Sequence, residues 1–86
     1  MTKEEFWNLK EEHPMIASIS SDCSTMTFKL LGAENEYILV LDDASQRDEY
    51  FEMLFRGSKA EMKNYLQDAV IPEHSAESLA VVLEEN

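Results

Sequence analysis

The chain is short of three residue types that shape folds and sites. Its 86 residues include one cysteine, two glycines and two prolines. A single cysteine, Cys23, excludes an internal disulfide and fits a reducing compartment. So few glycines and prolines argue against a low-complexity chain and exclude a glycine-rich phosphate-binding loop. Hydrophobic residues make up 44%. We therefore expect the chain to fold, as a single domain over residues 1–86.

Basic residues are scarce as well. Seven Lys and Arg face 18 Asp and Glu, for a formal net charge of −11. Binding to nucleic acid phosphates or to an anionic membrane requires a positive surface, so both are disfavoured. A cationic protein partner is favoured, and electrostatic attraction should steer its encounter with this chain.

The sequence also lacks long apolar runs. The opening "MTKEEFWNLKEE" has no apolar segment of the kind that a signal peptide needs. No apolar run approaches the ~18 residues that span a bilayer. We expect a soluble, cytoplasmic protein.

The first half of the chain predicts a helix followed by three strands. Thr2 and Glu5 form a capping box, and Pro14 ends the helix that they begin. "MIASIS" and "TMTFKLL" alternate as strands do, and "EYILVLD" is apolar on both faces from Tyr37 to Leu41. The short turns "SSDCS" and "GAEN" favour an antiparallel three-stranded meander.

The second half predicts helices. "SQRDEYFEMLFRG" carries an apolar stripe at helical spacing, formed by Tyr50, Phe51, Leu54 and Phe55, and Gly57 suits its end. Ser58 with Glu61 is another capping box, and its helix should end before Pro72. Residues 76–84 fit either a short helix capped by Ser75 or an edge strand. The predicted fold is α+β: a helix, a three-stranded antiparallel meander, then two to three helices packed on one face of the sheet.

Catalytic and metal-binding residues are few. His13 and His74 lie at predicted helix boundaries, and Cys23 lies in a serine-rich turn without a neighbouring base to lower its pKa. An EF-hand loop counted from Asp42 would need glycine at its sixth position, where Arg47 stands. We expect no enzymatic activity, no cofactor and no metal.

One stretch is densely acidic. "LDDASQRDEYFEM" is typical of a helix start, because a carboxylate caps a helix and complements its dipole. That interpretation does not account for Glu52, nor for Glu34 and Glu36 nearby. The alternative is a partner-binding surface formed by these acids. Its predicted residues are Glu34, Glu36, Asp42, Asp43, Asp48, Glu49 and Glu52, and Trp7 is the aromatic candidate for an interface.

The element order, the hairpin "LLGAENEYILVLDD", the segment "SQRDEYFEMLFRG" and the negative charge resemble small phage-borne inhibitors of bacterial defence, including one anti-CRISPR family that blocks a CRISPR nuclease. In those proteins, carboxylates stand where nucleic acid phosphates would stand. The same order also resembles a double-stranded-RNA-binding domain. That family needs a basic start to its last helix, and "DDASQRDE" is acidic.

Two functions follow as hypotheses. The first, which the resemblance implies, is a non-enzymatic inhibitor in a bacterial host that blocks a cationic, nucleic-acid-binding surface of another protein. The second is an immunity or adaptor protein that binds a basic partner without mimicry. Competition separates them, because a mimic must exclude nucleic acid from its target.

Overall fold

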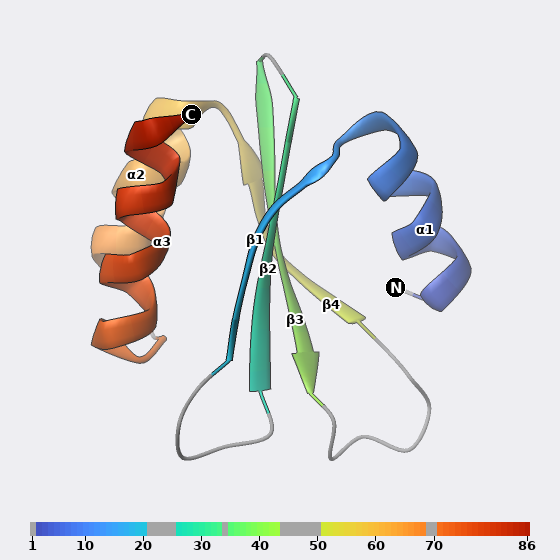
Figure 1. The fold of residues 1–86 in the computed structure, drawn as a ribbon, viewed down its shortest axis with the longest axis horizontal. Coiled ribbons are helices and arrows are strands. Elements are labelled where there is room, and N and C mark those ends of the chain that lie inside the picture. The colour runs from blue at the N-terminus through green and yellow to red at the C-terminus, as the bar shows by residue number, and fades with distance from the viewer. Residues whose placement is uncertain (1, 21–25, 34, 44–50, 69–70) are drawn as a thin grey trace.

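The computed structural model describes residues 2–20, 26–33, 35–43, 51–68 and 71–86. The described chain contains three helices and four strands (Figure 1). In chain order these are α1 (Lys3–Glu12), β1 (Met15–Ser20), β2 (Met26–Ala33), β3 (Glu36–Asp43), β4 (Phe51–Gly57), α2 (Lys59–Asp68) and α3 (Glu73–Glu85).

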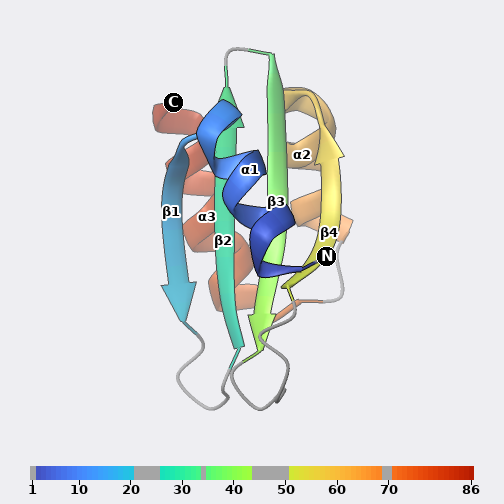
Figure 2. The ribbon, with the colours of Figure 1, turned by 90° about the vertical axis from the view of Figure 1, so that its right-hand side faces the viewer.

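The strands form one antiparallel sheet in the order β1-β2-β3-β4. Seen edge-on in Figure 1, the sheet stands between α1 on one side and the pair α2 and α3 on the other. Figure 2 shows α1 crossing in front of β2 and β3, with β1 and β4 at the two edges. The α+β class is confirmed, but the helices cover both faces of the sheet rather than one.

The helix boundaries follow the capping chemistry of the sequence. The Thr2 hydroxyl accepts from the Glu5 N–H at 3.2 Å, and Glu5 accepts from the Thr2 N–H, so the first capping box is confirmed. Ser58 and Glu61 make the same two contacts at the start of α2. α3 begins after Pro72 without a side-chain cap. Residues 76–84 belong to α3 and are helical. Ser75 lies inside α3 rather than capping it.

The larger core lies between the sheet and the α2–α3 pair. Phe28, Leu30 and Leu39 of the sheet meet Met62, Leu66, Leu79 and Leu83 of the helices, and all seven are buried. Ala17 and Ile19 extend this core toward β1. The apolar residues that alternate in β1 and β2 thus face the α2–α3 pair, the helices that the sequence predicted to cover the sheet.

A second, smaller core lies under α1. Phe6 stacks on Phe51 with ring centroids 4.4 Å apart, above the buried side chains of Leu31, Ile38 and Val40. The Lys29 ammonium lies 5.7 Å from the Phe6 ring centroid and 5.8 Å from that of Phe51. This cation–π contact adds to the apolar contacts that hold α1 on the sheet.

The fourth strand corrects the predicted helix. Residues 51–57 form β4, and the rest of the proposed helical segment, 45–50, lies outside the described residues. A bulge explains the misleading spacing. The register with β3 shifts between Leu39 and Val40, so Leu54 is an extra residue in β4. Leu54 and Phe55 then both face α2, whereas Phe51 faces α1, and the 51, 54, 55 spacing imitates a helix.

A cavity-forming substitution tests whether the sheet is covered on both faces. Ile38 faces α1 and is fully buried, so Ile38→Ala should lower the free energy of unfolding by ~2–5 kcal/mol. On α3, Val81 is 57% exposed, and Val81→Ala should change stability by less than ~0.5 kcal/mol. Urea denaturation of both variants measures the difference. Equal, small effects would contradict a second core under α1.

Candidate functional site

The seven acids that the sequence proposed as one surface do not lie together where the structure describes them. Glu36 begins β3, whereas Asp42 and Asp43 end it. Seven strand steps separate Glu36 from Asp43, which is ~23 Å at ~3.3 Å per residue. Glu52 lies in β4 opposite Leu41, so it is not on a helix with Asp48. Three of the proposed residues lie outside the described chain: Glu34, Asp48 and Glu49.

Glu36 takes part in a network of ion pairs and hydrogen bonds within the fold. Its Oε1 accepts from Arg56 Nη2 at 2.7 Å and lies 2.8 Å from His13 Nε2. The other ring nitrogen of His13 lies 3.3 Å from the Leu9 carbonyl oxygen. His13 thus connects the last turn of α1 to the start of β3. The hydrogen bond from Arg56 is the main cause that lowers the pKa of Glu36.

The remaining described members of the predicted set differ from one another. Asp42 lies 3.7 Å from the Lys29 ammonium and faces α1. Asp43, the next residue, points to the opposite face of the sheet, as strand alternation requires. Glu52 is exposed. The fold thus uses Glu36 and Asp42 to hold strands and helix together, which weakens their candidacy as partner-binding residues.

Exposed carboxylates are nevertheless abundant. Lys29, Arg56 and Lys63 are each engaged by an acid within the fold. Among the described residues, a larger group of acids is exposed and makes no ion pair or hydrogen bond. These acids are Glu4, Glu11, Glu12, Glu52, Asp68, Glu73, Glu77 and Glu85. The structure therefore pairs these three bases internally and leaves excess negative charge at the surface of the described chain.

α1 combines this charge with a large exposed aromatic ring. Phe6, Leu9 and His13 face the sheet, so the residues on the opposite side of α1 face solvent. Trp7 is 60% exposed, and the Lys10 ammonium lies 5.8 Å from its ring centroid. One continuous arc of the helix carries Trp7 with its acidic neighbours. We call this arc the Trp7 face; it consists of Glu4, Trp7, Asn8, Glu11 and Glu12.

A groove continues the Trp7 face toward β4. Its volume is about 320 Å³, and Leu9 and the 41%-exposed Met53 supply its apolar surface. Glu5, Asn8 and Glu12 line it from α1, and Arg56 lines it from β4. Asn8 also borders Trp7. The ring, the groove and the carboxylates therefore form one surface with apolar and acidic parts.

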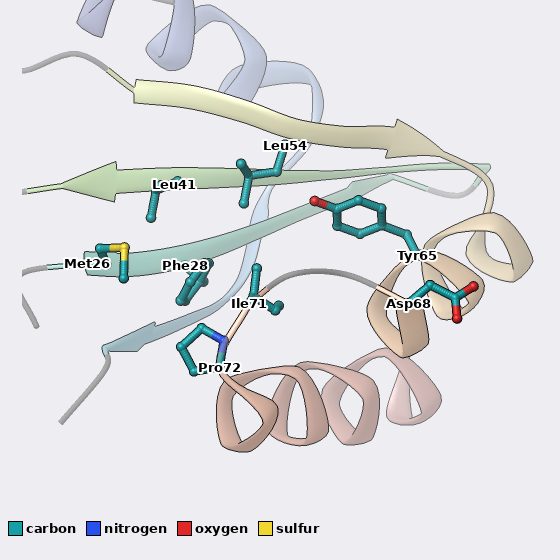
Figure 3. A pocket seen from close by; sticks show the side chains of 8 residues that line it. All are labelled: Met26, Phe28, Leu41, Leu54, Tyr65, Asp68, Ile71 and Pro72. Atoms are coloured by element: carbon teal, nitrogen blue, oxygen red, sulfur yellow. The ribbon is translucent and has the colours of Figure 1, made fainter. Parts of the chain in front are cut away.

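A different hollow lies between the end of the sheet and the α2–α3 side (Figure 3). It measures about 380 Å³, and apolar side chains dominate its lining: Met26, Phe28, Leu41, Leu54, Ile71 and Pro72, with Tyr65 and Asp68 beside them. Tyr65 stacks on Phe55 at 4.7 Å between ring centroids. The size suits a small molecule, but binding sites usually add several converging polar groups, which this lining lacks.

The residues weighed for catalysis are dispersed. His13 is buried in the Glu36 network, His74 is exposed at the start of α3, and Cys23 lies outside the described residues. Over the described ranges, no three His, Cys, Asp or Glu side chains gather as metal ligands would. In the same ranges, no helix has the length and apolarity to cross a bilayer.

Comparison of the chain with protein-family models, with curated proteins and with solved structures finds no match. The function is therefore argued from the chain's own residues and geometry.

Sequence reasoning found one member of the Trp7 face and missed the rest. Trp7 stood out because it lies beside the Phe6–Leu9 line, and its exposure agrees with that inference. The exposure of Glu4, Glu11 and Glu12 could also have been predicted from the sequence, because helical periodicity places them on the face opposite Phe6. Met53, which lines the adjoining groove, could not be found, because its segment was interpreted as a helix.

The Glu36 network predicts a specific pH dependence. Folding lowers the pKa of Glu36, so the Arg56 contact stabilises the fold at neutral pH, and this stabilisation is lost as pH falls through the lowered value. The stability difference between the parent and Glu36→Gln should therefore be largest near pH 7 and shrink below about pH 4. Denaturant unfolding across that range measures it. Glu52→Gln, at an exposed acid without a partner, should show no such trend. A Glu36→Gln difference that stays constant with pH would contradict the argument.

Proposed function

We propose that this protein is a non-enzymatic inhibitor that binds a cationic, nucleic-acid-binding surface of another protein and blocks it. The observation that carries the proposal is the Trp7 face, where an exposed tryptophan lies among carboxylates that have no basic partner in the described chain. The fold gains little from an exposed Trp7, because Phe6 and Leu9 already dock α1.

The two kinds of side chain contribute differently to binding. Tryptophan is among the residues most enriched at the energetic centres of interfaces, because it buries a large apolar area in a partner's pocket. The surrounding carboxylates repel one another in the free protein, and a cationic partner removes that repulsion. Charges at the rim of an interface act mainly on the association rate, so binding should weaken as salt increases.

The arrangement is compatible with mimicry of nucleic acid. Glu4 and Glu11 are seven residues apart on a helix, which is ~10.5 Å along its axis at ~1.5 Å per residue. A DNA strand advances ~3.4 Å per phosphate, so the pair spans about three phosphate steps. Carboxylates at this spacing can occupy part of a cationic groove that normally holds a backbone.

The alternative function is an immunity or adaptor protein that binds a basic partner without mimicry. Both functions use the same charge and the same exposed ring. They differ in whether nucleic acid and this protein can occupy the partner together. Capture of the partner from a bacterial host with the tagged chain, followed by titration of the purified complex with duplex DNA or RNA, decides between them. Mutual exclusion supports the inhibitor, and a ternary complex supports the adaptor.

Two variants that lose the same number of charges from different helices test where the binding surface lies. The variant Glu4→Gln, Glu11→Gln, Glu12→Gln should weaken binding to the captured partner by about threefold to a hundredfold at low salt, at ~0.2–1 kcal/mol per exposed charge. The matched control is Glu73→Gln, Glu77→Gln, Glu85→Gln, which removes the same charge from α3. Calorimetric titration measures both. Equal losses would mean that net charge alone drives binding.

The tryptophan has its own test. Trp7→Ala should weaken binding by tenfold or more, since residues at interface centres lose ~2 kcal/mol or more on truncation. Val81→Ala truncates another exposed apolar side chain and should leave the affinity unchanged. Trp7 is the sole tryptophan of the chain, so its fluorescence reports binding in the parent. An unchanged affinity of Trp7→Ala would place the interface elsewhere.

A further inference from the structure

The two edges of the sheet differ in their charge. β4 carries Glu52 and Arg56, both exposed. β1 carries the sequence MIASIS, without any charged residue over Met15–Ser20. Edge strands offer unpaired backbone N–H and C=O groups, and proteins commonly protect them with charges. In Figure 2, β1 forms an outer edge of the sheet with no further strand outside it, and α3 lies behind it. Past the bulge at Ile16, the segment Ala17–Ser20 of β1 is therefore the less protected edge.

The neighbouring surface of α3 is also uncharged. Ala76 and Ala80 face α2, and Glu84 of the same helix face pairs with Lys63 of α2. Ser78 and Val82 lie on the side of α3 away from α2; both are half-buried, and Val82 packs against the core together with Ala17 and Ile19 of β1. α3 packs on β1, so these two side chains continue the strand's uncharged surface. Glu85 marks the far end of this surface.

We propose that β1 pairs with β1 of a second copy of this chain and joins the two sheets. A two-fold axis makes this contact self-complementary, and antiparallel pairing of two identical edge strands has that symmetry. The register of β1 with β2 is regular from Ala17 to Ser20, which gives a straight segment for pairing. The α3 helices of the two copies then lie side by side, and small side chains at Ser78 permit close approach.

Electrostatics selects a second copy over other occupants. Each copy carries −11, so two copies can approach only across a surface without carboxylates. β1 with Ser78 and Val82 is such a surface. An extended segment of a cationic partner would gain no electrostatic attraction there, because β1 carries no acid. Backbone hydrogen bonds and apolar contacts are the remaining sources of affinity, and both act between like-charged copies.

The charge also fixes the salt dependence of the dimer. Like-charge repulsion between copies is screened as ionic strength rises, so the dimer should strengthen with salt. Binding through the Trp7 face should weaken over the same range. This opposite sign makes the dimer independent of the proposed function, and either can fail alone.

Analytical ultracentrifugation of the full chain, from micromolar to millimolar concentration, tests the proposal. The dimer fraction should increase between about 0.05 and 0.5 M NaCl as the screening length falls. The disruptive variant is Ser18→Glu. Position 18 is exposed and lies opposite Lys29 in the sheet, so the new carboxylate has a cross-strand cation within its own copy. Two-fold antiparallel pairing centred on Ser18 sets this position opposite its own copy and so places two such carboxylates next to each other.

We expect Ser18→Glu to raise the dimer dissociation constant at least tenfold while the melting temperature of the monomer stays near that of the parent. The matched control is Asn64→Glu, which adds the same charge at an exposed position of α2 and should leave association unchanged. A parent chain that remains monomeric at every salt and protein concentration overturns the proposal. A dimer that Ser18→Glu leaves intact overturns the assignment to β1.

Discussion

The burial of β3 on both faces is the constraint on which the rest of the structure depends. Ile38 and Val40 face α1, whereas Tyr37 and Leu39 face the α2–α3 pair, and all four are buried. A strand that is apolar on both faces needs a layer on each side and a hydrogen-bonded neighbour along each edge. α1, the helix pair, β2 and β4 supply these four neighbours. The position of α1 follows from this requirement, and so does the exposure of its outer side, where Trp7 lies.

Much of this arrangement could be predicted from local chemistry. Two capping boxes, the alternation in β1 and β2 and the apolar run in β3 specified their elements correctly. β4 could not be predicted, because its bulge at Leu54 gives a strand the apolar spacing of a helix. The run from Tyr37 to Leu41 did contain the missing information. A central strand covered on both faces is incompatible with helices packed on one face of the sheet, and it predicts a further strand beside it.

The candidate surface was less predictable for a related reason. Sequence proximity grouped Glu36, Asp42 and Glu52, but strand geometry separates the first two by nearly the length of β3. Ion pairs then distinguish acids that hold the fold together from acids that face solvent. Arg56 engages Glu36 and Lys29 engages Asp42, and both contacts join residues distant in sequence. Charge counts alone cannot make that distinction, because every acid contributes equally to a net charge.

The distribution of charge also determines how the two proposed interfaces relate in space. Dimerisation through β1 uses a two-fold axis perpendicular to the joined sheet, so α1 of each copy lies on the same side of that sheet. Two Trp7 faces would then be presented together to an extended cationic surface. Linked sites raise avidity through effective concentration without new contacts, provided that both can engage at once. A nucleic-acid-binding groove is long enough in principle to accept both faces, whereas a compact basic partner would accept one. The dimer would therefore favour the extended target over the compact one, and this preference follows from leaving the β1 edge uncharged.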